Sequence, residues 1–187
     1  MGVPMRAVAA RLFATGPSPQ RVALVGAGQI GAAVGVGLLK AGHQVTVTDP
    51  STANKEQLVA AGARWVDTAA ETLCGDDHDV LITALPAPPH VRAVMEAGDD
   101  GAGQELLAKM RAGTTWIDHT TTSPDEAKRL HGCAEEVGVR PLEAPLTGGY
   151  ELLVAGMMTT LVGGEVGLMK EHEGLMRSYI ETVLHMG

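Results

Sequence analysis

The sequence predicts an α/β fold built on a doubly wound, mostly parallel sheet. From Arg21 onward, short apolar segments alternate with segments of helical periodicity, and this alternation is typical of parallel strands joined by helices. Residues 79–85 (DVLITAL) form a near-continuous apolar run, as expected for a strand buried on both faces. A glycine-rich turn joins the first apolar segment to the first helical one, which is a common ligand-binding arrangement in such sheets.

The elements of the first half follow from their residue patterns. The apolar pattern predicts strands at residues 21–26 (RVALVG), 43–49 (HQVTVTD), 64–66 and 79–85, of which the third is weak. One helix is expected from the glycine turn to about Ala41, and another at residues 54–61. Gly35 and Gly37 lie within the first of these helices, where each is expected to cost about 1 kcal/mol in helix propensity.

The second half continues the alternation. Ser123, Pro124 and Glu126 form a capping box with proline at the first helical position. Helices are predicted at residues 91–97, 104–111, 124–137 and 165–180, strands at 114–119, 139–144, 157–164 and 181–187, and a loop at 98–103. The last helix should place one apolar face against the core, made of Leu168, Met169, His172, Leu175, Met176, Tyr179 and Ile180.

Composition and charge exclude several classes of protein. The 187 residues carry a formal net charge of -8, which argues against binding to nucleic acid. Val22 to Leu39 is uncharged, but it contains five glycines and Gln29, so we predict that it does not span a membrane. Cys74 and Cys133 show no zinc-site spacing, and two free thiols are expected.

The N-terminal 20 residues differ from the rest. They contain Arg6 and Arg11 but no acidic residue, and a helix there would place Met5, Val8 and Leu12 on one face. This pattern is that of a mitochondrial transit peptide, and a disordered terminus is the alternative. We therefore expect a leader or disordered segment at 1–20, a folded domain at 21–187, and a location in the mitochondrial matrix or otherwise the cytoplasm.

The glycine turn carries the first chemical signal. Gly26, Gly28 and Gly31 form a G-x-G-x-x-G that closes a predicted strand and opens a predicted helix, which is the context of a dinucleotide-binding turn. Asp49 ends the second predicted strand. A carboxylate there accepts hydrogen bonds from ribose hydroxyls and repels a 2′-phosphate, which favours NAD over NADP as the cofactor. The alternative is a plain glycine turn with a solvated aspartate.

Three further loops follow predicted strands, where doubly wound sheets bind ligands. Residues 85–90 combine Leu85 and several prolines with His90 at the next helix start, and a rigid connector is the alternative interpretation. Residues 118–122 carry three consecutive threonine hydroxyls, which also suit an ordinary turn. Residues 145–149 offer a hydroxyl and consecutive backbone N–H groups for an anion, or form a simple Gly-Gly turn.

Together these loops resemble the β-hydroxyacid dehydrogenases, the group that includes 3-hydroxyisobutyrate dehydrogenase. The matching segments are GAGQIGAAVGVGLLKAGHQVTVTD, ITALPAPPHVRAVM, WIDHTTTSPD, LEAPLTGG and TTLVGG. The resemblance covers residues 21–187 and implies a Rossmann-type cofactor domain. It implies cofactor contacts at Gly26, Gly28, Gln29, Ile30, Gly31, Asp49, Leu85, Pro86, His90 and Thr121, and substrate contacts at Thr120, Thr147, Gly148 and Gly149.

The departures from the family pattern shape the functional hypothesis. Ile30 replaces a methionine, His90 an asparagine, and Thr120 and Thr147 replace serines. The family's catalytic lysine follows an H-x-G element, and residues 185–187 resemble the start of that element. We therefore expect no catalytic residue in this chain, and a helical domain, through which the family usually forms oligomers, beyond residue 187.

Two functional readings remain open. The chain is the NAD-binding domain of an enzyme that oxidises a small 3-hydroxy acid, or a stand-alone NAD(H)-binding module without turnover. An imine reductase is disfavoured by the loops at 118–122 and 145–149, which suit a carboxylate. The first reading predicts an exposed apolar face at Tyr179, Ile180, Val183 and Leu184.

Two other candidate groups are weaker. His119 lies beside Thr120 and could act as a base, but a histidine at a loop edge is more often structural. Residues 76–79 (DDHD) are interpreted as a polar turn before a buried strand, and no metal site is predicted.

Overall fold

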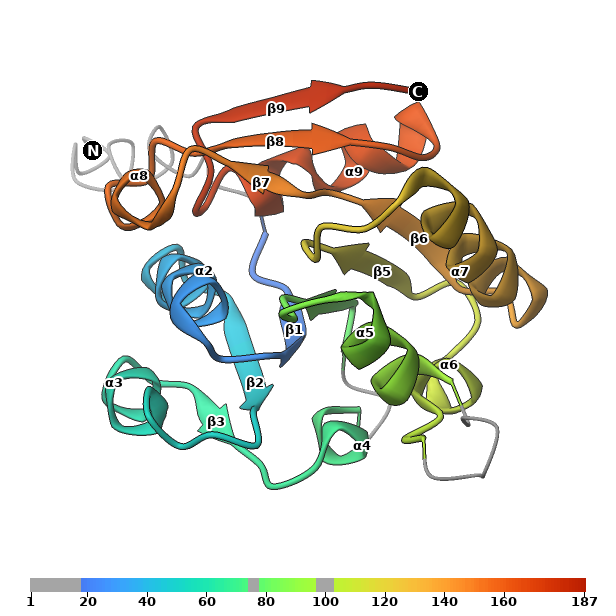
Figure 1. Ribbon diagram of the computed structural model, residues 1–187. Coiled ribbons are helices and arrows are strands. Elements are labelled where there is room, and N and C mark those ends of the chain that lie inside the picture. The colour runs from blue at the N-terminus through green and yellow to red at the C-terminus, as the bar shows by residue number, and fades with distance from the viewer. Residues whose placement is uncertain (1–17, 74–77, 97–102) are drawn as a thin grey trace, which may run out of the picture.

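The main sheet is six-stranded and entirely parallel. The computed structural model describes residues 18–73, 78–96 and 103–187. The strand order is β3-β2-β1-β4-β5-β6 (Figure 1), and every neighbouring pair is parallel. Its strands are β1 (Arg21–Val25), β2 (Gln44–Thr48), β3 (Arg64–Trp65), β4 (Val80–Thr83), β5 (Thr115–Asp118) and β6 (Arg140–Glu143). The predicted α/β fold class is confirmed.

Helices cover both faces of this sheet. Side chains alternate along each strand, so Val22 and Leu24 of β1 join one buried cluster, while Ala23 and Val25 join the other. The first cluster is covered by α2 (Gln29–Lys40), α3 (Lys55–Ala60) and α9 (Val166–Met176). The second is covered by α4 (Ala69–Thr72), α5 (Pro88–Met95), α6 (Leu106–Lys109) and α7 (Pro124–Glu136).

This topology fixes where a ligand can bind. β1 and β4 are neighbours in the sheet, yet β1 continues into α2 on one face and β4 into α5 on the other. The two connections diverge at the carboxyl ends of these strands and leave a crevice, which is the usual ligand position in doubly wound sheets. The glycine turn and the loop at 85–90 therefore face each other across it.

The C-terminal part forms a second, three-stranded sheet. It contains β7 (Leu146–Thr147), β8 (Thr159–Val162) and β9 (Thr182–His185) in the order β7-β8-β9 (Figure 1). The short helix α8 (Tyr150–Val154) lies in the connection from β7 to β8. The predicted strands at 157–164 and 181–187 thus lie outside the main sheet. β7 and α8 were not predicted, because elements of two and five residues carry too little periodicity to detect.

Several predicted boundaries are corrected. α5 begins at Pro88 rather than at residue 91, since proline fits the first helical turn. α9 ends at Met176, and residues 177–179 form a turn that leads into β9. The N-cap at Ser123 is confirmed, because its side chain accepts a hydrogen bond from the Glu126 N–H. The Glu126 carboxylate bonds Arg92 and Arg129 instead of completing the capping box.

The predicted exposed apolar face is wrong in part. Tyr179 and Ile180 are buried in the core, at 4% and 2% exposure, because the turn after α9 folds them toward α2. Val183 is half-buried, and Leu184 is exposed. The face predicted at these four positions therefore reduces to the outer side of β9.

Three further predictions concern the N-terminal leader, membrane-spanning helices and the two cysteines. Of the leader expected at residues 1–20, residues 1–17 lie outside the described part of the chain. Within the described residues, every helix is too short or too polar to cross a membrane. Cys133 is a free thiol, and Cys74 lies outside the described part of the chain.

Candidate functional site: a cleft at the carboxyl ends of β1, β4 and β5

The glycine turn has a different physical reason for each glycine. Gly26 has φ +99°, and a Cβ there would lie 2.3 Å from the Ala84 carbonyl oxygen. A Cβ at Gly31 would lie 1.9 Å from the Gly26 carbonyl oxygen, so this glycine lets α2 approach the turn. A Cβ at Gly28 would meet nothing within 4 Å. Gly26 and Gly31 are thus required by packing, whereas Gly28 borders open space.

Gly28 also stands at the N-cap of α2. The first N–H groups of a helix have no intrahelical acceptor and carry the positive end of the helix dipole. At α2 they are not covered by a capping side chain, since the cap residue is glycine. Open space beside uncapped N–H groups is the arrangement that binds a phosphate.

Asp49 braces this turn. Its Oδ2 accepts a hydrogen bond of 2.6 Å from the Ala27 N–H, and its Oδ1 accepts one of 2.7 Å from the Ser51 N–H. The side chain is only half-buried, so each oxygen retains a lone pair for a further donor. Asn54 adds a contact that the sequence did not indicate, because its Nδ2 donates to the Ala27 carbonyl at 2.8 Å.

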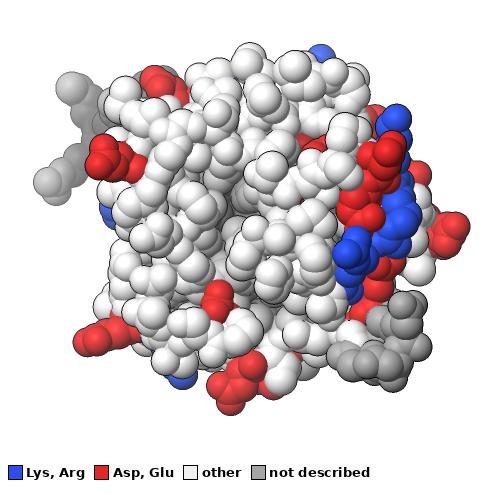
Figure 2. Space-filling model, viewed as in Figure 1, with Lys and Arg blue, Asp and Glu red and all other residues white. Residues whose placement is uncertain are grey.

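Two adjoining cavities form the cleft. One of about 420 Å³ lies between the glycine turn and the loops after β4 and β5, and the other, of about 720 Å³, extends past β2 and α5. They share Asp49, Leu85 and Pro86. Figure 2 shows a hollow near the middle of this face, with few charged side chains around it.

The cleft brings together nine of the ten predicted cofactor residues. Gly31 is the exception, since it packs behind the turn. The nine that line one or both cavities are Gly26, Gly28, Gln29, Ile30, Asp49, Leu85, Pro86, His90 and Thr121. Residues far apart in the sequence therefore share one site, and their role in binding a cofactor stays a prediction.

The three threonines after β5 have different surroundings. Thr120 is buried, and its Oγ1 accepts a hydrogen bond of 3.1 Å from the Leu85 N–H, which ties this loop to the one after β4. Thr121 is exposed and lines the cleft. The Thr122 hydroxyl oxygen is buried, without a hydrogen-bond partner among the described residues. The predicted cofactor residue Thr121 therefore lines the cleft. The predicted substrate residue Thr120 lies behind the residues that line the cavities, and its role in binding a substrate stays a prediction.

Asp118 anchors the start of the same loop. Its Oδ1 accepts hydrogen bonds from the Thr83 hydroxyl at 2.7 Å and from the Thr120 N–H at 2.9 Å. Burial raises the pKa of the Asp118 carboxyl, and burial together with the neighbouring Asp118 charge raises the pKa of Glu143. The Asp118 carboxyl thus holds the start of the loop from within the sheet.

His119 lines the cleft but is occupied by structural bonds. Its Nδ1 lies 2.7 Å from the Ala144 carbonyl oxygen, which only an N–H can satisfy. In that tautomer Nε2 carries the lone pair, and it accepts from the Tyr179 hydroxyl at 2.9 Å. Burial lowers the pKa of His119 to about 4. His119 is therefore a neutral structural residue, and its proposed use as a base does not fit this geometry.

The loop at 145–149 lies beside the cleft. Leu146 lines the cavity next to Thr121 and His119. Thr147, Gly148 and Gly149 are exposed, and both glycines have positive φ values, 129° and 83°. The three predicted substrate residues of this loop thus border the cleft without lining the cavity. Their role in binding a substrate stays a prediction.

Gly35 and Gly37 gain a structural reason. A Cβ at Gly35 would lie 2.8 Å from Leu58 of α3, and one at Gly37 would lie 2.6 Å from the Tyr179 Cβ. Both glycines let α2 pack closely against its neighbours. The predicted cost in helix propensity is therefore accompanied by close packing that a larger residue would prevent.

The region of residues 76–79 is only partly visible. Asp76 and Asp77 lie outside the described residues, while the Asp79 carboxylate pairs with Arg21 at 3.0 Å. Among the described residues, histidine, cysteine and carboxylate side chains do not gather in groups of three or more suited to a metal ion.

The buried histidine predicts a pH dependence of stability. Because the pKa of His119 is lowered to about 4 from 6.5, the unfolded chain binds the extra proton first as the pH falls. The contribution of neutral His119 to the free energy of unfolding is complete above pH 6.5. It is lost as the pH falls toward and through the folded-state pKa of about 4. We expect urea unfolding to show a loss on the order of 2 to 3 kcal/mol from this residue between pH 7 and 4.

A variant isolates this effect from the other histidines. Burial also lowers the pKa of His43, His131 and His172, so they contribute in the same direction. His119→Gln removes the titrating group and should make the loss of stability with acid smaller by that amount. An unchanged pH profile in this variant would contradict the assignment.

The fold and the cleft define a dinucleotide-binding domain of the Rossmann type. The chain belongs to the family of the NAD-binding domain of 6-phosphogluconate dehydrogenase, whose family model matches residues 21–187. The resemblance inferred from the sequence is thereby confirmed.

Individual relatives agree with this assignment. The chain is 34% identical to NAD-dependent L-serine dehydrogenase of Pseudomonas aeruginosa over 90% of this chain and 54% of that protein. It is 32% identical to 3-hydroxyisobutyrate dehydrogenase of the same organism over 89% of this chain and 53% of that protein. The chain thus spans about half the length of these curated relatives.

A solved structure shows the same fold. It is that of 3-hydroxyisobutyrate dehydrogenase from Mycobacterium tuberculosis with L-serine, at a TM-score of 0.80 and 28% identity. The match covers 89% of this chain and 54% of that one.

Proposed function

We propose that this chain binds NAD in the cleft and serves as the cofactor-binding part of an oxidoreductase that oxidises a small 3-hydroxy acid. The observation that carries the proposal is the glycine turn. Packing demands glycine at Gly26 and Gly31, but Gly28 faces open space beside the uncapped start of α2. A glycine that packing does not require is explained by a ligand that needs the backbone to be accessible.

The residues present fit this cofactor. The N–H groups at the start of α2 would hold the pyrophosphate, and Asp49 would accept hydrogen bonds from the adenosine ribose. Leu85, Pro86 and Thr121 would flank the other half of the dinucleotide, across the crevice between β1 and β4. Bound NAD supplies the acceptor for the hydride, and the chain's own residues bind and orient it.

We favour NAD over NADP because of the charges around the larger cavity. Among its described lining residues, Asp49 and Asp67 are carboxylates and Lys109 is the one lysine or arginine. A 2′-phosphate beside Asp49 would meet a like charge, whereas a ribose hydroxyl would find an acceptor there.

The substrate class rests on the loops and on the relatives. 3-Hydroxyisobutyrate and L-serine, the compounds in the relatives' names, share a carboxylate and a hydroxyl on carbon 3. The hydroxyl of Thr120 accepts from Leu85 and keeps its own hydrogen to donate. Thr147 and the N–H groups of Gly148 and Gly149 would complete the carboxylate site.

The proton of the substrate hydroxyl needs an acceptor. His119 does not fit this role, because the lone pair on its Nε2 already accepts a hydrogen bond from the Tyr179 hydroxyl. Lys170 does not fit either, because it is exposed on α9 and lines neither cavity of the cleft. We therefore assign this step to the lysine that the family resemblance implies beyond residue 187, and we assign binding and orientation to this chain.

Turnover by the natural protein tests the proposal. The complete protein from its source, given NAD, should produce NADH with L-serine or 3-hydroxyisobutyrate. L-lactate, a 2-hydroxy acid of similar size, should give little. Absence of NADH production with any short 3-hydroxy acid would contradict the proposed activity.

A further inference from the structure

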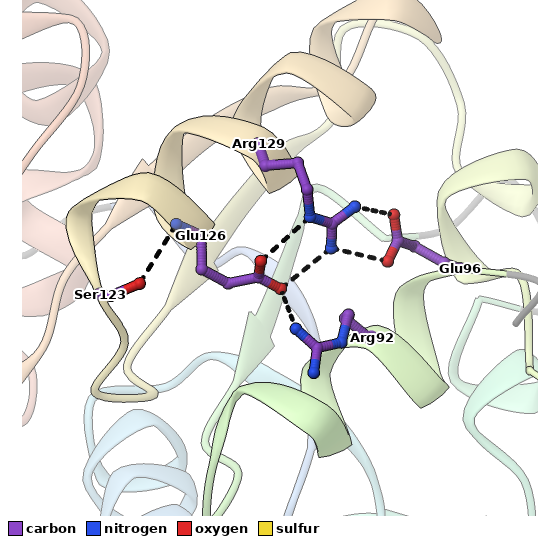
Figure 3. Close-up of polar contacts among 5 residues, drawn as sticks. All are labelled: Arg92, Glu96, Ser123, Glu126 and Arg129. Carbon is purple, nitrogen blue, oxygen red and sulfur yellow. Dashed lines mark hydrogen bonds and ion pairs between the residues drawn. The ribbon is translucent and has the colours of Figure 1, made fainter.

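An ion network joins the two helices that begin at the cleft. The Arg129 guanidinium of α7 makes paired hydrogen bonds to Glu96 at 2.7 and 2.9 Å, just after α5 (Figure 3). It makes a second pair of bonds to Glu126, at 3.0 and 2.9 Å. Arg92 of α5 completes the network by donating to Glu126 at 2.7 Å. All three nitrogens of Arg129 are therefore engaged, and α5 and α7 are linked at two points.

The two carboxylates of this network are stabilised in their charged form. Hydrogen bonds from Arg129 and Arg92 lower the pKa of Glu126 to about 2, and those from Arg129 lower the pKa of Glu96. Isolated surface ion pairs contribute little, but paired Arg–carboxylate bonds within a network restrict their members to one geometry. Figure 2 shows positive and negative side chains gathered at one edge of a largely uncharged face, on the side where α7 lies in Figure 1.

The network lies directly behind two loops of the cleft. Arg92 is two residues beyond the cleft-lining His90 on α5, and Glu126 lies in the first turn of α7, where Ser123 caps the helix. The loop between β5 and α7 carries Thr121. The bond from the Leu85 N–H to Thr120 joins these same two loops inside the protein. The two loops are therefore linked inside the protein by the hydrogen bond from Leu85 to Thr120 and at its surface by the ion network.

We propose that Arg129 is a positioning residue that sets the spacing of the loops after β4 and β5, and thereby the binding of the nicotinamide half of the dinucleotide. The inference rests on the proposed binding of NAD. In doubly wound sheets the two halves of a dinucleotide bind on opposite sides of the crevice. The glycine turn and Asp49 belong to the adenosine side, and they do not contact the network in the bonds described above. Thr121 of the loop after β5 lines only the smaller cavity. The loop after β4 lines both cavities through Leu85 and Pro86 and the larger one through His90, so a smaller effect on the adenosine half is expected as well.

Binding of two nucleotides to the 187-residue chain separates positioning from general stability. ADP carries the adenosine and both phosphates but lacks the nicotinamide half. Arg129→Gln should raise the Kd of NADH by about three- to tenfold and that of ADP by less than about twofold, measured by calorimetry. Glu96→Gln, which removes the link from Arg129 to the end of α5 and leaves the one from Arg92 to Glu126, should give the same pattern. The double variant should add little to either single one, because the two residues share one interaction.

A matched control lies on the opposite face of the sheet, which α9 covers. Arg140, the first residue of β6, pairs with Glu171 at 2.8 Å, and its side chain is about as exposed as that of Arg129, so Arg140→Gln should leave both Kd values unchanged. Equal losses for NADH and ADP in both network variants, or unchanged NADH binding, would overturn the positioning role. If the wild-type chain binds neither nucleotide, the proposed function fails, and this inference fails with it.

Discussion

Gly28→Asp should abolish NADH binding while leaving the fold as stable as before. Aspartate is a favoured N-cap residue and its charge suits the start of a helix, and a Cβ at this position meets nothing within 4 Å. We expect the free energy of unfolding to stay within about 1 kcal/mol of wild type. The carboxylate would occupy the phosphate site with a like charge, so the Kd of NADH should rise at least about a hundredfold.

Two companion variants show whether the loss is specific. Gly28→Asn adds a side chain of the same shape without the charge, and the difference between the two variants measures electrostatic repulsion. Gly132→Val, on α7, also meets open space and should change neither stability nor binding appreciably. Undiminished NADH binding by Gly28→Asp would mean that the ligand does not lie at the start of α2.

Asp49→Asn should reverse or erase the preference for NADH over NADPH. The asparagine oxygen can still accept from the Ala27 N–H, so the glycine turn should be retained with the loss of one of the two backbone bonds. Removing the charge weakens the ribose contact and relieves repulsion of a 2′-phosphate. The ratio of the two Kd values should therefore shift toward NADPH by about 10- to 100-fold.

Asp67→Asn provides the control for this effect. Asp67 lines the same cavity as Asp49 but does not contact the glycine turn in the bonds described, so its substitution should shift the ratio far less. Equal shifts in both variants would indicate a general effect of negative potential. A wild-type preference for NADPH that Asp49→Asn leaves unchanged would refute the assignment of Asp49.

The sequence predicted the main sheet and the cleft because their signals are local. The G-x-G-x-x-G turn, the apolar run of β4 and the N-cap at Ser123 each depend on adjacent residues. Parallel strands then bring the ends of distant segments to one edge. Nine of the ten cofactor residues named from the sequence consequently line one cleft.

What the sequence did not predict depends on long-range packing. Tyr179 was predicted both on the buried face of the last helix and on an exposed apolar face, and it is buried in the turn after α9. Its hydrogen bond to His119 spans 60 positions in the sequence. The threonines at 120–122 are chemically alike, and only the approach of the Leu85 N–H gives Thr120 its separate role. Asn54 and the Arg129 network likewise involve partners more than 25 positions away.

A calorimetric titration of the 187-residue chain with NADH tests the central claim most directly. We expect saturable binding of one NADH per chain, with a Kd in the micromolar range, on the order of 1 to 100 μM, competition by ADP, and weaker binding of NADPH. Heat signals no different from dilution at millimolar NADH would contradict the account, because the open space at Gly28 would then have no nucleotide to explain it.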